Sequence, residues 1–408
     1  MKGLLRNFWP YLAIIGPGII TSTVDNDASG IATYSVAGAQ FGFSLIWTLI
    51  PITLLLIVIQ EMVARMAVVT GKGLADLIRE EFGVKLTLII LVGLFIANLS
   101  TTVAEFAGMA AAGELLGISR YIVVPLCALI IWLFIVRSNY KTVEKIFLVL
   151  ILFYGLYVIS GFLAKPDWGE VGRQAIMPSI KFTSSYWFVL VAVVGTSVTP
   201  WMQFYLQSSI VEKGLKIEHF KITRWDIIIG SVITSIVALF IIVSAASAVN
   251  TEGAVSVENV AKALEPVAGR FASTVFAFGF FMAAFLGAWI VPLSTAYFIT
   301  EGIGFESGIN KSIHEAPQFY ILLGTTLFIA AGIILIPGVP LIPIILISQV
   351  INALLLPIVL LLVLILINNK RIMKNHSNTK LMNIISVTVL FALVAMGVIL
   401  VITSFGAG

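Results

Sequence analysis

Apolar stretches long enough to cross a lipid bilayer recur along the whole chain, with short polar segments between them. They lie near residues 11–38, 44–70, 86–113, 119–136, 143–164, 184–211, 225–249, 271–300, 317–337, 340–367 and 381–404. A membrane helix needs about 20 predominantly apolar residues. The pattern therefore predicts an all-α polytopic membrane protein with eleven spans, forming a single transmembrane domain over residues 1–408.

Composition and charge support this prediction. The chain is 60% hydrophobic and only 11% charged, whereas soluble domains carry about 25% charged residues. The single Cys127 and the three His residues exclude an intramolecular disulfide and a zinc cluster. The net charge of +4 reflects an excess of Lys and Arg, which in membrane proteins marks the cytoplasmic loops and contacts acidic lipid headgroups. We therefore expect no nucleic-acid partner.

The distribution of Lys and Arg predicts the orientation. If eleven spans alternate, three quarters of these residues share the side of the N-terminus. Positively charged loops stay in the cytoplasm, so we expect a cytoplasmic N-terminus in the cell (plasma) membrane and an external C-terminus. The eleventh span, residues 381–404, is expected to be an extra helix beside a ten-helix core.

Two spans contain residues that interrupt a helix. The first carries Gly16-Pro17-Gly18 and then a polar run from Thr21 to Gly30, and the sixth carries Gly195-Thr196-Ser197-Val198-Thr199-Pro200. Backbone carbonyls freed by Pro and Gly are tolerated at membrane depth only where protein or a water-filled cavity satisfies them. Broken helices in corresponding positions of two halves mark a transporter's midplane site. We predict a LeuT-type inverted repeat of 5+5 helices, over about 10–165 and 184–368.

Acidic residues inside the spans identify a candidate ion site. Asp25 and Asp27 lie in the first break, where an ionised carboxylate costs at least about 2.5 kcal/mol. They repel each other unless a cation lies nearby, and a divalent ion supplies that charge. Alternatively, either Asp caps the second half-helix. An oxygen-rich shell for a hard cation would come from Asn26, Ser29, Thr196, Thr199, Gln203 and freed carbonyls.

Three further charged residues are candidates for gating or relay. Glu61 and Arg65 are spaced i, i+4 in the second span and can pair on one helix face, which favours a structural pair near the cytoplasmic gate. Glu105 has no cationic neighbour in sequence. It is a protonatable relay, a salt-bridge partner of the gate or a neutral hydrogen-bonded acid. In the tenth span, Gln349 lies beside the site or bonds to a neighbouring helix.

These residues resemble the Nramp (natural resistance-associated macrophage protein) divalent-metal transporters. The matching segments are Gly16-Pro17-Gly18, Asp27 to Thr33, Ala37 to Gly42, Ala104-Glu105, Thr199-Pro200, Tyr205 to Val211, Ser348-Gln349-Val350 and Leu356-Pro357. The resemblance implies a LeuT-type fold with eleven or twelve helices. It also implies inward transport of Mn²⁺, Fe²⁺ or related metals together with protons.

Departures from the family pattern change the expected selectivity. Anchoring on Ala32-Thr33 places Asp27 on the family's metal-binding Asp and Gly30 on its Asn ligand. In helix six, Thr196 stands where the family has an Ala whose carbonyl binds metal, and Thr199 replaces a Met ligand. Soft sulfur favours transition metals, whereas hydroxyls and carbonyls suit hard ions. The resemblance is therefore to the Nramp-related magnesium transporters, with Mg²⁺ or Mn²⁺ as the transported substrate.

A second set of departures concerns protons. Thr102 stands where the family has an Asp before the helix-three Glu, and Trp201 and Gln207 replace two His residues. Since His is the side chain best suited to exchange protons near neutral pH, we expect weak or no proton coupling.

The sequence leaves other functions open. An ordinary proton-coupled Mn²⁺/Fe²⁺ symporter is the main alternative, and a Na⁺-coupled amino-acid symporter is another. An intramembrane enzyme is disfavoured because His219, His314 and His376 all lie in loops. The chain carries no nucleotide, haem or zinc motif, so we expect no cofactor. We expect the transport unit to be a monomer, as is usual for this fold.

Overall fold

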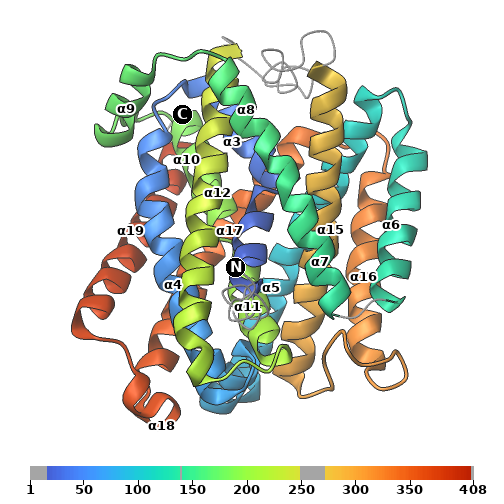
Figure 1. Ribbon diagram of the computed structural model, residues 1–408, viewed down its shortest axis with the longest axis vertical. Helices are drawn as coiled ribbons and strands as arrows, with labels where there is room; N and C mark the ends of the chain where they lie inside the picture. Colours follow the sequence, from blue (N-terminus) through green and yellow to red (C-terminus); the bar gives the residue numbers. More distant parts are fainter. Residues whose placement is uncertain (1–15, 138–139, 249–271, 406–408) are drawn as a thin grey trace, which may run out of the picture.

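The computed structural model describes residues 16–137, 140–248 and 272–405, and this part of the chain is helical (Figure 1). The helices are α2 (Pro17–Thr23), α3 (Ala28–Phe41), α4 (Leu49–Thr70), α5 (Leu74–Leu115), α6 (Arg120–Arg137), α7 (Tyr140–Leu150), α8 (Gly155–Leu163), α9 (Trp168–Ile176), α10 (Ser184–Ser197), α11 (Pro200–Glu212), α12 (Phe220–Ala248), α15 (Ala272–Ile303), α16 (Pro317–Ile334), α17 (Leu341–Asn368), α18 (Lys370–Met373) and α19 (Lys380–Phe405).

The predicted all-α membrane architecture is confirmed. Within the described residues, ten helical segments are long and apolar enough to cross a membrane, and α10 with α11 counts as one of them. The first predicted span falls outside this set because its two halves, α2 and α3, are each too short. Together they supply the eleventh span. Its beginning, residues 11–15, lies outside the described residues.

Two helical features were not predicted from the apolar pattern. The short helix α9 lies between the fifth and sixth spans, and the Asp167 side chain caps it by accepting from the amides of Gly169 and Glu170 at 2.9 and 3.2 Å. In addition, α5 begins at Leu74, before the predicted span at 86, and turns at Gly83, where φ is 78°. Neither segment has the length of apolar chain that identifies a span.

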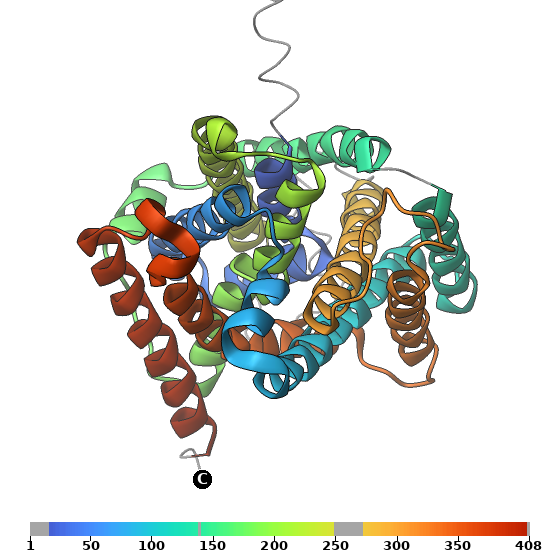
Figure 2. The same cartoon turned by 90° about the horizontal axis from the view of Figure 1, so that it is seen from below.

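The broken helices lie in the middle of the bundle. α12 packs along both α2 and α3, and α10 packs on α3 and α17. α2 and α12 approach closely because glycines meet at their contact: a Cβ on Gly230 would lie 2.8 Å from the Cα of Ile19. Figure 2 shows α19 at the edge of the bundle, as expected for an extra helix.

Candidate metal-binding site

The break in the first helix is centred on Asp27. After α2, a 3-10 turn (Val24–Asn26) leads to Asp27, whose backbone is extended, and α3 begins at Ala28. Asp27 Oδ1 accepts a hydrogen bond from the Gly30 amide at 2.9 Å. Of the two acids considered as caps, Asp27 is therefore the one that caps α3.

Glu105 of α5 also contacts the start of α3. Its Oε1 accepts from the Ser29 hydroxyl at 2.5 Å, and its Oε2 accepts from the Ala28 amide at 3.2 Å. The carboxyl is fully buried, and the absence of a side chain on Gly287 of α15 leaves room for it. Glu105 forms no salt bridge in the described part of the chain. Glu105 is thus a hydrogen-bonded acid that links α5 to the break in the first helix. Its role as a relay stays a prediction.

Asp25 differs from Asp27 in its bonding. It is 1% exposed, and both of its carboxylate oxygens lack a hydrogen-bond partner among the described residues. The neighbouring Asn26 donates to the Thr234 carbonyl of α12 at 3.2 Å, while its Oδ1 has no partner within the same residues. A buried carboxylate without a partner is costly, so this turn has oxygen atoms available for a cation.

The break in the sixth helix supplies further polar groups. α10 ends at Ser197 and α11 starts at Pro200. The Thr199 hydroxyl and both polar atoms of the Gln203 amide are buried, and they have no hydrogen-bond partner in the described ranges. The oxygen atoms of these neutral groups are suitable ligands for a hard cation whose charge is balanced by a nearby carboxylate.

Contacts between helices bring the two breaks together. A Cβ on Gly30 would collide with the backbone carbonyl of Asp25 and would lie 3.6 Å from the Thr196 hydroxyl oxygen, so the glycine lets the turn containing Asp25 pack against α3 beside Thr196. One turn further along α3, a hydrogen bond of 2.7 Å joins the hydroxyls of Tyr34 and Ser197. The turn containing Asp25 also contacts α10.

Gln349 of α17 lies against the same part of α10. Its backbone carbonyl packs on Gly195, where a side chain would collide with it. Its side-chain amide donates to the Ser348 hydroxyl at 2.9 Å and accepts from the Asn352 amide at 3.3 Å. Gln349 is therefore near the break but is hydrogen-bonded within its own helix, and its role as a ligand stays a prediction.

The residues of the candidate site are rich in oxygen atoms and are buried. The described residues contain no group of three or more His, Cys, Asp or Glu side chains placed to hold a metal. A cation between the breaks would be held by one or two carboxylates with hydroxyl, amide and carbonyl oxygens. Asp27 is only 4% exposed, so its carboxylate has little contact with solvent.

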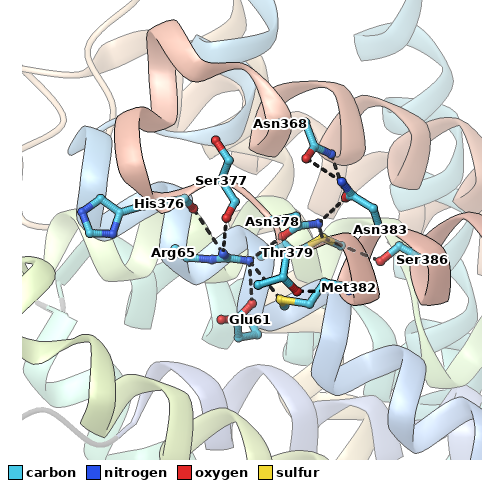
Figure 3. A network of polar contacts seen from close by, with 11 residues as sticks. Glu61, Arg65, Asn368, His376, Ser377, Asn378, Thr379, Met382, Asn383 and Ser386 are labelled. Carbon is cyan, nitrogen blue, oxygen red and sulfur yellow. Dashed lines mark hydrogen bonds and ion pairs between the residues drawn. The ribbon is translucent and has the colours of Figure 1, made fainter.

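Glu61 and Arg65 form the predicted pair, with Glu61 Oε2 and Arg65 Nη2 3.0 Å apart. Figure 3 shows that the guanidinium also contacts the segment before α19. It donates to the backbone carbonyls of His376 and Ser377 at 3.1 and 3.3 Å and to Asn378 Oδ1 at 2.6 Å. The pair joins α4 to the last helix.

Sequence reasoning missed Asp226, near the start of α12. Its carboxylate accepts from the backbone amides of Gly16, Gly18 and Ile19 at 3.2, 2.7 and 3.3 Å, so it caps α2. Gly16 has a φ of 147°, a conformation that favours glycine. The sequence feature that could have identified Asp226 is its position as an acid inside the seventh apolar stretch, beside Trp225.

Solved structures of other proteins share this architecture. The manganese transporter of Eremococcus coleocola, in complex with an aromatic bis-isothiourea substituted compound, matches with a TM-score of 0.79 and 21% identity, covering 97% of this chain and 87% of that chain. Mhp1, a nucleobase-cation-symport-1 family transporter in a closed conformation with bromovinylhydantoin bound, matches with a TM-score of 0.58 and 13% identity, covering 95% and 90%. The fold is therefore of LeuT type.

The sequence itself gives the family. Residues 18–403 match the family model described as natural resistance-associated macrophage protein-like. The chain therefore belongs to the Nramp family, and the resemblance seen in the sequence is confirmed.

Proposed function

We propose that this protein takes up divalent metal cations, Mg²⁺ or Mn²⁺, by alternating access through the site between the two broken helices. The observation that carries the proposal is the Asp25 carboxylate, which is buried next to Asp27 and has no partner among the described residues. Family membership supports divalent-metal transport. The protein would act as a monomer in the plasma membrane, with its N-terminus in the cytoplasm.

The donor set supports a preference for hard cations. Thr196, Thr199 and Gln203 offer hydroxyl, carbonyl and amide groups, which select Mg²⁺, Ca²⁺ or Mn²⁺ rather than soft metals. Mg²⁺ usually keeps several waters when bound. The Asp25 backbone carbonyl and the Thr196 hydroxyl both lie beside Gly30 and would offer hard oxygen atoms to such a hydrated ion.

Weak or absent proton coupling is the second part of the proposal. Thr102 donates to the Asn98 carbonyl at 2.8 Å, and Gln207 donates to the Lys72 carbonyl at 2.8 Å. Trp201 is fully buried. None of these three side chains exchanges protons near neutral pH, so the helices that carry them would form no relay at these positions.

Uptake by an Asp27→Asn variant tests the function. Asn is as good an N-cap as Asp, so the variant keeps the cap on α3 while losing the charge. We expect a melting temperature close to that of the wild type and Mn²⁺ uptake into proteoliposomes lowered at least about tenfold, the effect of losing one charged contact of about 1.5 kcal/mol. Asp27→Ala is expected to lose both the cap and uptake. Normal uptake by either variant would contradict the proposal.

A further inference from the structure

A second polar cavity lies away from the two helix breaks. It has a volume of about 290 Å³ and lies where α11 and α15 end, under the loop that follows α15. Its lining includes Ser208, Glu212, Tyr297, Glu301 and Lys311. The Lys and Arg distribution predicts that this end of the bundle faces the cytoplasm. The proposed transport site does not use any of these residues.

Glu301 is the unexplained group in this cavity. It is 7% exposed, so more than nine-tenths of it is buried. Its Oε1 accepts from the Ser208 hydroxyl at 2.6 Å, but its Oε2 is buried without a hydrogen-bond partner in the described part of the chain. The carboxylate lies against Gly73, where any side chain would overlap it. A buried carboxylate oxygen in this state calls for a cation or a proton.

A second carboxylate, that of Glu212, lines the same cavity. It accepts from the Tyr297 hydroxyl and from the Asn310 amide, the latter at 2.9 Å. Lys311, a cationic residue of the lining, pairs with Glu306 of the loop. Neither Glu212 nor Glu301 forms a salt bridge within the described residues, so two acids share the cavity without a paired cation.

We propose that this cavity is a second binding site for a divalent cation, with the Glu301 and Glu212 carboxylates and the Ser208 hydroxyl as its oxygen ligands. Two carboxylates balance a charge of +2, and all three groups are hard donors. Since a water occupies about 30 Å³ in the liquid, the cavity has room for an ion with part of its hydration shell.

The position of the site suggests where its ion comes from. α11 runs from the break at Thr199 to Glu212 at the cavity, and its 13 residues span about 20 Å. An ion released between the broken helices would meet this cavity at the far end of the same helix. The inference rests on the proposed function only for the choice of ion.

Counting bound Mn²⁺ on the purified full-length protein tests the inference. Electron paramagnetic resonance distinguishes free from bound Mn²⁺ during a titration. We expect two equivalents on the wild type and one on Glu301→Gln. We also expect one on Glu212→Gln, a second variant in case the first does not fold, and one on the Asp25→Asn/Asp27→Asn double variant. Glu315→Gln, in the same loop but outside the cavity lining, is the matched control and should keep two.

The outcomes separate the two proposals. If Glu301→Gln and Glu212→Gln both keep the wild-type number of bound ions, the cavity site is overturned, whatever the double variant does. If the double variant keeps the wild-type number while Glu301→Gln loses an ion, the cavity site stands and the transport site fails. A wild type that binds a single ion, lost only in the double variant, also overturns the cavity site.

Discussion

Asp25 and Asp27 are separated by one residue but have different roles at the residue scale. Asp27 uses one oxygen to cap α3, so its identity is partly explained by helix formation. Asp25 makes no such bond within the described residues, and its burial is unfavourable unless a cation balances the charge. We therefore consider Asp25 the more informative position for ion binding.

Replacing Asp25 by Asn tests this difference. The amide has nearly the same shape but no charge, so we expect the variant to melt above the wild type when a chelator removes metal. Adding Mn²⁺ at 100 times the dissociation constant of the Asp25 site should stabilise the wild type by about 2.7 kcal/mol more than the variant. Melting curves in detergent with and without Mn²⁺ measure both effects. Equal stabilisation of the two proteins would show that Asp25 does not bind the ion.

At the scale of helices, the two halves of the first broken helix are held by one local acid and by two acids from distant parts of the chain. α3 is capped by Asp27 and Glu105, and α2 is capped by Asp226. Asp27 and Glu105 satisfy amide groups that the first break would otherwise leave unpaired, and Asp226 does the same at the opposite end of α2. The first broken helix therefore depends on contacts with α5 and α12.

Asp226→Ala should weaken the attachment of α2. It removes the acceptor for three backbone amides, so we expect a loss of about 1–3 kcal/mol in the free energy of unfolding. Asp226→Asn keeps one acceptor oxygen and should lose less. Thermal unfolding in detergent measures both, with the exposed Glu218→Ala as the control. A melting temperature for Asp226→Ala equal to that of the control would contradict the capping role.

Arg65→Ala should release the segment before α19 from α4. The guanidinium donates to two backbone carbonyls and to Asn378 there, and Lys cannot reproduce this forked geometry. We expect faster amide hydrogen exchange over 374–380 in both Arg65→Ala and Arg65→Lys, with exchange in α15 unchanged. Unaltered exchange over 374–380 would mean that other contacts hold this segment.

The sequence predicted the features that depend on local pattern. Apolar length revealed the spans, Gly and Pro revealed the breaks at Asp27 and Thr199, and the i, i+4 spacing revealed the Glu61–Arg65 pair. It did not reveal that Asp226 caps α2, because Gly16 and Asp226 are 210 positions apart. The contact between Glu301 and Ser208 was equally hidden, because the two residues are 93 positions apart.

At the scale of the whole molecule, a buried site rich in oxygen and the residues Thr102, Trp201 and Gln207 fit the proposed uptake driven by the membrane potential. The potential contributes about 2.3 kcal/mol per charge for each 100 mV. At a potential of about 100 mV, a divalent ion therefore gains about 4.6 kcal/mol on entering the cell. This free energy is enough to accumulate the ion more than about thousandfold inside. Such a transporter would need no proton gradient.

Competition between Mg²⁺ and Mn²⁺ in proteoliposomes tests the central claim most directly. Mn²⁺ influx is followed with and without excess external Mg²⁺, while a dye in the lumen reports pH. Our account predicts that Mg²⁺ inhibits the influx and that the lumen does not acidify. Mn²⁺ influx that is insensitive to Mg²⁺ and accompanied by acidification would contradict it and would identify an ordinary proton-coupled symporter.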